Sequence, residues 1–100
     1  MIGIDLTRIS RFASMPTQRL EQIAKKFNTH FLTYQEAAKW WACHEAIIKC
    51  LGSSPDWKYS KITFPKNQSP TYIGKESIKL SISHEGDYIA AVAFLVPNKF

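Results

Sequence analysis

The sequence predicts a single α+β domain in which helices pack on a mainly antiparallel sheet. Two observations carry this prediction. Apolar residues at helical spacing fill most of the first half of the 100-residue chain, and alternation with a period of two fills most of the second half. A hundred residues fit one domain of common size, and neither an internal repeat nor a linker divides residues 1–100.

The composition is that of a folded protein with a basic balance. Hydrophobic residues make up 45% and charged residues 21% of the chain, and 13 Lys and Arg against 8 Asp and Glu give a net charge of +5. This charge suits an acidic partner, such as a nucleotide, a nucleic acid or an acidic protein, and does not choose among them.

No segment predicts a membrane span or an export signal. The longest apolar runs are far shorter than the roughly 18 residues of a span, and the first ten residues have no basic region before their apolar part. Cys43 and Cys50 lie seven residues apart on one predicted helix, roughly 10 Å along its axis and beyond disulfide reach. We therefore expect reduced core cysteines, a cytoplasmic location and no membrane partner.

The first elements are a strand and two helices. Residues 1–6 are a short apolar run, which predicts a buried strand ending near Asp5. Residues 7–15 predict a short helix that stops before Pro16, where a second helix can begin. Four apolar residues of this second helix fall at helical spacing: Leu20, Ile23, Ala24 and Phe27.

The next helix has the clearest boundaries. Thr33 followed by Glu36 is a capping box, and Gly52 is a typical C-terminal stop. One seam of this helix is apolar: Trp40, Cys43, Ile47, Cys50 and Leu51. A second row lies broadly opposite the seam: Trp41, Glu45 and Lys49. We therefore expect the carboxylate and the ammonium of this row on an accessible face or in a cleft.

Strands dominate the rest of the chain. Residues 84–87 predict a hairpin turn, with Gly86 supplying its backbone freedom. The last strand is apolar on both faces, which requires cover on both sides, and in a domain this small another subunit can supply one layer. The predicted strands are residues 57–64, 71–73, 77–83 and 88–96. In the third of them, Ile78, Leu80 and Ile82 lie on one face.

Two acids suggest a cation site. If the fold brings Asp5 and Glu45 together, they form a two-carboxylate site for Mg²⁺, whose remaining ligands are typically waters and substrate phosphates. Lys49, one turn beyond Glu45, would meet the same phosphates as a point charge. An ordinary surface ion pair between Glu45 and Lys49 is the simpler interpretation, and spacing alone leaves both open.

A second polar cluster lies near the predicted hairpin. The sequence pattern brings Ser81, Ser83 and His84 together at this point. Their hydroxyls and imidazole suit phosphate oxygens, although a polar hairpin tip is the simpler interpretation of this stretch alone. Neighbouring strand residues face opposite sides, so Ser83 and His84 are a poor nucleophile–base pair. Aromatic and basic residues alternate in residues 57–64, which leaves a nucleic-acid-binding domain as an alternative.

Three segments together resemble one family. "IGIDLTRISRF", "WWACHEAIIKCLG" and "LSISHEGDYIAAVAF" occur in the order and at the distances seen in holo-[acyl-carrier-protein] synthases, the small bacterial 4′-phosphopantetheinyl transferases. "NQSPTY" stands where the family usually has a Gly-Lys-Pro-like turn, with Pro70 retained. The resemblance covers almost all of residues 1–100 and implies one transferase domain of that type.

The resemblance implies a reaction. The family transfers the 4′-phosphopantetheine arm of coenzyme A to a serine of apo acyl carrier protein, for fatty acid synthesis, and releases adenosine 3′,5′-bisphosphate. Asp5 and Glu45 match its ligands for Mg²⁺, with Mn²⁺ as a substitute, and Lys49 matches the lysine that contacts the coenzyme A phosphates. These three residues form the implied catalytic group, and Ser83 and His84 match the motif near the nucleotide.

The resemblance also implies partners. Family members are homotrimers with sites between subunits, so that His84 would act from the neighbouring chain. Arg11 matches an arginine that meets the acidic carrier protein, and Arg8 lies beside it. We expect no nucleic-acid partner. The base that accepts the serine proton stays open between a metal-bound water and a carboxylate acting through water.

Three departures from the family pattern have consequences. His44 stands where the family has lysine, which predicts a pH-dependent contact with phosphate. Arg8 stands where an acid is common, which predicts a positive charge near the metal site. Residues 27–41 compress a longer segment and leave open what holds the adenosine end. These departures motivate the alternative of a coenzyme-A- or nucleotide-binding relative with weakened or lost turnover.

Overall fold

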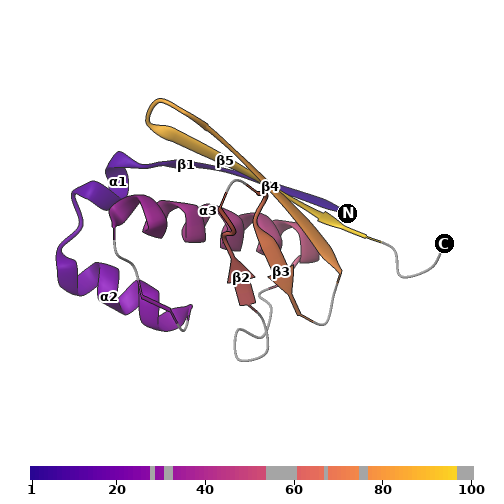
Figure 1. Cartoon of the computed structure of the whole chain (residues 1–100), viewed down its shortest axis with the longest axis horizontal. Helices are drawn as coiled ribbons and strands as arrows, with labels where there is room; N and C mark the ends of the chain where they lie inside the picture. The colour runs from indigo at the N-terminus through magenta and orange to yellow at the C-terminus, as the bar shows by residue number, and fades with distance from the viewer. Residues whose placement is uncertain (28, 31–32, 54–60, 67, 75–76, 97–100) are drawn as a thin grey trace.

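The computed structural model describes all residues except 28, 31–32, 54–60, 67, 75–76 and 97–100. Five strands form one antiparallel sheet in the order β1-β5-β4-β3-β2. The long helix α3 packs on one face of the sheet, beneath β1 and β5, and α1 and α2 contact α3 (Figure 1). This arrangement confirms the predicted α+β class.

Strand β1 (Ile2–Arg8) is longer than the sequence predicts. It pairs with β5 (Tyr88–Leu95) along its whole length, from Ile2 opposite Phe94 to Arg8 opposite Tyr88. The expected end near Asp5 is therefore wrong, because the ladder to β5 continues for three more residues. Helix α1 (Ser10–Ala13) is correspondingly shorter than the predicted helix over residues 7–15.

Helix α2 (Thr17–Lys26) begins directly after Pro16, as predicted. Pro16 is extended, with φ −61° and ψ 149°, so the ring ends the preceding segment and the helix starts at the next residue. Ile23, Ala24 and Phe27 are buried, and Leu20 packs against the core at its margin. The helical spacing of these apolar residues therefore identified the buried side of α2.

Helix α3 (Tyr34–Leu51) has the boundaries that its capping signals predict. The Thr33 hydroxyl accepts a hydrogen bond from the N–H of Glu36 at 3.2 Å. Gly52 ends the helix with φ 77°, a conformation that side chains disfavour, and its N–H donates to the carbonyl of Ile48 at 2.8 Å. The predicted seam is buried at Cys43, Ile47 and Cys50 and partly buried at Trp40 and Leu51.

A glycine sets the distance between β1 and α3. A Cβ on Gly3 would lie 1.9 Å from the carbonyl oxygen of Ala46 and 2.5 Å from the backbone nitrogen of Cys50. Strand and helix backbones therefore touch at this point, which only glycine allows. The helix face beneath the sheet is correspondingly small and fully buried, at Ala38, Ala42 and Ala46. Asp5 follows Gly3 on the same face of β1 and is thereby brought beside α3.

The remaining strands form the other half of the sheet. Strand β2 (Lys61–Thr63) lies within the predicted strand over residues 57–64, and residues 57–60 lie outside the described part of the chain. Strand β3 (Thr71–Ile73) matches its prediction. Strand β4 (Ile78–Glu85) continues two residues beyond its predicted end, because both residues pair with β5. The turn is confined to Gly86 and Asp87, with φ 56° at the glycine.

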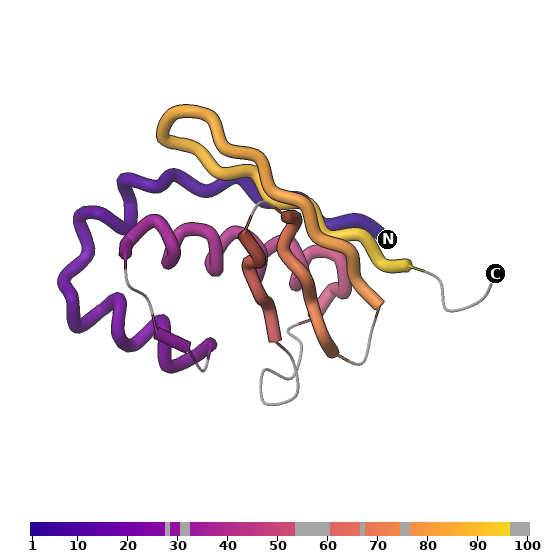
Figure 2. Tube along the Cα trace, in the orientation of Figure 1, coloured from indigo at the N-terminus to yellow at the C-terminus, as the bar shows by residue number. Residues whose placement is uncertain are grey.

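The sheet has one covered and one uncovered face. On β5, Ile89, Ala91 and Ala93 are buried against the helices, and β4 adds Ile78 and Leu80 to this core. The opposite face, here called the outer apolar face, carries exposed residues of two adjacent strands: Ile2, Ile4, Leu6, Val92 and Phe94. The expectation that β5 is apolar on both faces is confirmed. Figure 2 shows β1, β5 and β4 side by side above α3.

Two smaller expectations concern membranes and cysteines. Among the described residues, no helix has the length and apolar character that a membrane span requires. Cys43 and Cys50 are buried free thiols. Burial, together with the nearby negative charge of Asp5, raises the pKa of Cys43 to about 12, so this thiol is protonated and unreactive at neutral pH.

Candidate functional site

Asp5 is a nearly buried carboxylate with both oxygens occupied. Its residue is only 9% exposed. Oδ2 accepts a hydrogen bond from the Thr7 hydroxyl at 2.5 Å, and Oδ1 lies 3.1 Å from the Lys49 ammonium. Thr7 was not among the predicted site residues, although its place two residues after Asp5 puts both side chains on one face of the strand. The fold therefore holds this carboxylate in a fixed orientation.

Lys49 joins the helix to the strand. Its ammonium donates to the backbone carbonyl of Ile4 and to Asp5 Oδ1, each at 3.1 Å, while 52% of its side chain stays exposed. The lysine therefore does not merely face solvent as half of a helix-surface pair with Glu45. It neutralises an acid on another element and keeps an open side from which an anion can approach.

Glu45 lies one helical turn before Lys49 and is partly buried. Residues four apart on a helix are surface neighbours, with Cβ atoms about 5–6 Å apart. Glu45 is thus on the same row of α3 that reaches Asp5 through Lys49. The structure brings Asp5 and Lys49 into direct contact and places Glu45 one turn along from that contact.

The residues present fit a magnesium ion brought together with a phosphate substrate. The Asp5 carboxylate already faces a cation through Oδ1, and a second carboxylate, Glu45, lies one helical turn before that cation, Lys49. The described residues contain no group of three or more His, Cys, Asp and Glu side chains suited to a metal. Two carboxylates suffice for Mg²⁺ only when water and substrate phosphates supply the other oxygens, which is its usual mode of binding.

His44 is surrounded by aromatic rings. Its imidazole makes an edge contact with Phe27, with ring centroids 4.9 Å apart, and lies 6.3 Å from the Trp41 ring. Burial, with a smaller contribution from the charge of Lys26, lowers the pKa of His44 to about 4. His44 is therefore neutral at neutral pH, so any contact with phosphate would be a neutral hydrogen bond and not an ion pair.

His84 shares a sheet face with Asp5 but lies two strands away. One cross-strand row contains Asp5, Ala91 and Ile82. The next row on this face contains Thr7, Ile89 and His84. Two strand spacings correspond to about 10 Å, so the exposed imidazole is separated from the carboxylate site within one chain.

Ser83 faces the other side of the sheet. Neighbouring residues on a strand alternate, so Ser81 and Ser83 lie on the side of the outer apolar face while His84 lies on the α3 side. The expected convergence of these three side chains is therefore wrong within a single chain. It failed because β4 continues through Glu85 as regular strand, where a turn had been expected.

The two arginines have different surroundings. Arg8 lies on the face of β1 opposite Asp5, and its guanidinium donates to the Tyr88 hydroxyl at 3.0 Å. The expectation of a positive charge near the metal site is therefore wrong for Arg8, because strand alternation turns it away. Arg11, on α1, is exposed and lies over the ring of Trp41.

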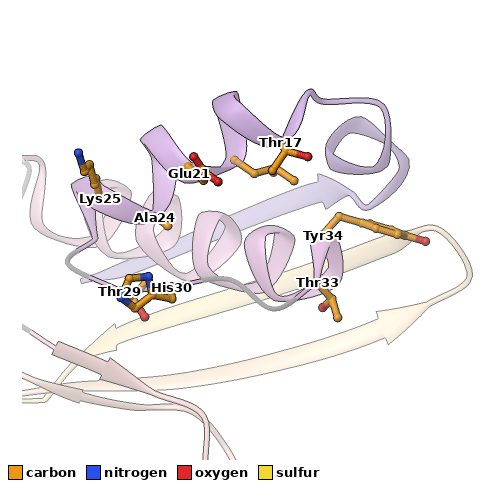
Figure 3. Close-up of a pocket in the computed structure, with 9 residues that line it drawn as sticks. Thr17, Glu21, Ala24, Lys25, Thr29, His30, Thr33 and Tyr34 are labelled. Carbon is orange, nitrogen blue, oxygen red and sulfur yellow. The ribbon is translucent and has the colours of Figure 1, made fainter.

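A separate hollow of about 570 Å³ lies between α2 and the start of α3 (Figure 3). Its rim carries Glu21 and Lys25 of α2, Tyr34 of α3, and His30, which lies between the two helices in the chain. None of the predicted site residues lines it. The partly buried contact of Asp5 and Lys49, between β1 and α3, is thus distinct from this hollow.

Comparison with curated proteins finds relatives of a single description among those most similar to the chain. No family model matches the chain. A holo-[acyl-carrier-protein] synthase from Mycoplasma mobile is 33% identical over 99% of this chain and 90% of the relative. The enzyme of the same description from Nautilia profundicola is 35% identical over 96% of this chain and 99% of the relative.

Solved structures agree with the sequence relatives. The holo-[acyl-carrier-protein] synthase of Helicobacter pylori in complex with coenzyme A has a TM-score of 0.75 at 21% identity, covering 96% of this chain and all of that one. A synthase from Bacillus anthracis in complex with coenzyme A (3′,5′-ADP) has a TM-score of 0.65 at 22% identity, covering 94% of this chain and 93% of that one.

The fold is therefore that of a small phosphopantetheinyl transferase. The near-complete coverage of sequence relatives more than 30% identical makes the assignment specific: the chain belongs to the holo-[acyl-carrier-protein] synthase family.

Proposed function

We propose that this chain transfers the 4′-phosphopantetheine arm of coenzyme A to a serine hydroxyl of apo acyl carrier protein, for fatty acid synthesis. The whole chain, residues 1–100, forms the transferase domain. One observation carries the assignment to specific residues. In a member of this family, β1 and α3 hold a nearly buried carboxylate, Asp5, against the ammonium of Lys49, with Glu45 one turn away.

The reaction breaks the phosphoanhydride bond of coenzyme A and forms a phosphodiester bond to the carrier serine. The serine oxygen of the carrier forms a bond to the phosphorus that bears the pantetheine arm, and the bond from this phosphorus to the oxygen of adenosine 3′,5′-bisphosphate breaks. The serine proton passes to a base, for which water activated by one of the carboxylates is suited. Lys49 has an exposed side and meets the phosphate oxygens, where it stabilises the charge that develops on the leaving group.

Asp5 and Glu45 would hold the Mg²⁺ ion, with Mn²⁺ as a substitute. When bound, the ion supplies positive charge to the pyrophosphate oxygens. The fixed orientation of Asp5, set by the Thr7 hydroxyl, keeps the protein's share of the ligands in place before substrate arrives. In the free protein, Asp5 Oδ1 faces the Lys49 ammonium. This oxygen can serve the ion only if the ammonium leaves it, and Lys49 would then contact phosphate instead.

The outer apolar face supports assembly into a homotrimer with sites between subunits. It presents exposed Ile2, Ile4 and Phe94 on one continuous surface of β1 and β5, which is unusual for a surface left in water. A second copy is the occupant that this proposal assigns to it. Assembly would also bring His84 of a neighbouring chain to the carboxylate site, which this imidazole does not reach within one chain.

The proposed partner is an acidic carrier protein. The net charge of +5 and the exposed Arg11 on α1 support this partner, with Arg8 beside it at the end of β1. A cytoplasmic location remains a prediction from the sequence.

Transfer is tested by intact mass of a purified apo carrier protein after incubation with the protein, coenzyme A and MgCl₂. The expected result is a mass gain of one phosphopantetheine group, abolished by EDTA and by Glu45→Gln. Thr17→Ser, at the start of α2 and outside the proposed site, is the control variant and keeps the wild-type rate. Binding of coenzyme A in a thermal melt without any mass gain would instead favour the alternative of a relative that has lost turnover, which the neutral His44 motivates.

A further inference from the structure

Helix α1 carries the proposed carrier contact but is too short to be stable alone. It spans only Ser10–Ala13, and isolated helices shorter than about 12 residues are marginal in water. The position of Arg11 therefore depends on contacts that α1 makes with other elements. Two such contacts are present, one from the β4–β5 turn and one from α3.

The first contact fixes the backbone of α1. Asp87, in the β4–β5 turn, accepts hydrogen bonds from the N–H of Ser10 at 2.9 Å and from the Ser10 hydroxyl at 2.6 Å. The carbonyl of Asp87 also accepts the N–H of Ile9 at 2.8 Å. The turn thus supplies the cap that the sequence at the start of α1 does not supply itself.

The second contact fixes a side chain. The guanidinium carbon of Arg11 lies 5.0 Å from the centre of the Trp41 ring and 5.5 Å from the centre of the Phe12 ring. These two rings are themselves in contact, with centroids 6.1 Å apart. Phe12 is completely buried, so it anchors the pair to the core, whereas Trp41 is only partly buried and offers its face to the arginine.

Trp41 also belongs to the row of α3 that carries Glu45 and Lys49. It is one turn before Glu45, so the same side of one helix meets the arginine at one end and the proposed phosphate site at the other. We infer that Trp41 is a positioning residue for the carrier substrate, which holds the Arg11 guanidinium in the orientation that meets an acidic carrier. This inference rests on the proposed function.

The physical reason is that a pre-ordered Arg11 side chain loses less conformational entropy when the carrier binds. A free arginine on a surface populates many rotamers, and most of this freedom is lost when its planar head binds a carboxylate. A ring that already holds the guanidinium by a cation–π contact reduces the loss on binding, while the edge of the guanidinium stays available for hydrogen bonds. Removal of the ring should therefore weaken carrier binding and leave coenzyme A binding unchanged.

The test is steady-state transfer with either substrate varied, using wild type, Trp41→Leu and Trp41→Phe. Trp41→Leu should raise the KM for the apo carrier by roughly three- to fivefold, the scale of an exposed cation–π contact, with kcat and the KM for coenzyme A unchanged. Trp41→Phe, which keeps an aromatic face, should restore most of the carrier affinity. Trp40→Leu is the matched control, because Trp40 packs on Phe27 and Phe64. This substitution should lower stability without raising the carrier KM.

A double-substitution cycle separates positioning from general packing. If Trp41 acts through Arg11, then Trp41→Leu should have no further effect on the carrier KM in an Arg11→Gln background. Additive effects, or an unchanged carrier KM in Trp41→Leu, would overturn the inference.

Nuclear magnetic resonance gives a readout that needs no turnover. The side-chain signals of Arg11 should carry a ring-current shift that Trp41→Leu removes and Trp40→Leu does not. Absence of this shift in the wild type would overturn the inference even if the protein is an active transferase. Failure of the wild type to modify any carrier, with the shift present, would instead refute the proposed function.

Discussion

Gly3→Ala tests whether close contact between β1 and α3 builds the site. The new Cβ would lie 1.9 Å from the carbonyl oxygen of Ala46, whereas ordinary contacts begin at 3.4 Å, so strand and helix must separate by about 1.5 Å. Both opposing atoms are backbone, which cannot rotate away as a side chain can. We therefore expect a loss of about 3 kcal/mol in the free energy of unfolding, at the upper end for overpacking.

The same displacement should affect the chemistry. Asp5 is two residues from Gly3, and its partners on α3 would be left about 1 Å or more out of place, an error that costs on the order of 100-fold in rate. The assays are urea unfolding and carrier modification by intact mass. Gly52→Ala is the control: its φ of 77° causes strain of about 1 kcal/mol, but nothing lies within 4 Å of the new Cβ and the site is not moved. A Gly3→Ala protein with wild-type stability and rate would refute this reasoning.

Three further predictions concern single side chains. Lys49→Met should leave Asp5 nearly buried without its cation, costing about 1–2 kcal/mol of unfolding free energy in urea titrations and raising the KM for coenzyme A; an unchanged stability would contradict the ion pair. The pKa of His44 is about 4 in the folded protein, against 6.5 for an ordinary histidine. The unfolded chain therefore binds more protons between these values, and stability should fall as pH drops from 7 to 4. Over this pH range, the free energy of unfolding of His44→Phe should fall by about 2 kcal/mol less than that of the wild type, after allowance for solvent screening. Parallel pH profiles of the two proteins would contradict the burial of the His44 imidazole. Asp87→Asn should weaken the cap at Ser10 by about 1 kcal/mol in thermal unfolding, and an equal Tm would show that α1 does not depend on it.

Local signals were sufficient where the structure depends on neighbouring residues. The Thr33 cap, the Gly52 stop and the start of α2 after Pro16 each depend on contacts within a few residues, and all three boundaries are confirmed. The apolar character of β5 on both faces likewise follows from the strand's own alternation. These predictions needed no knowledge of which elements meet.

Long-range contacts decided the features that the sequence did not reveal. The sequence did not predict that β1 extends from Asp5 to Arg8, because the residues of β5 that pair with it lie eighty or more positions away in the chain. The role of Gly3 could not be seen, since a glycine in an apolar run does not say which backbone it will touch. Alternation, which already separated Ser83 from His84, could also have placed Arg8 on the face opposite Asp5, had the end of β1 been known.

The site itself came from a family pattern more than from residue spacing. Spacing on α3 left Glu45 and Lys49 open as an ordinary surface pair, and the structure shows why this was incomplete: the lysine contacts Asp5 on β1. The neutral state of His44 also could not be predicted, because it results from burial beside Phe27, which follows α2, and Trp41 of α3.

The most direct test of the central claim is a crystal structure with coenzyme A and Mn²⁺, in which anomalous scattering locates the ion. The claim is that Asp5 and Glu45 form one metal site that serves a phosphate substrate. We predict a single strong anomalous peak within ligand distance of both carboxylates and of the pyrophosphate oxygens, with Lys49 turned from Asp5 to phosphate. A manganese ion bound away from either carboxylate, with coenzyme A in place, would contradict the claim.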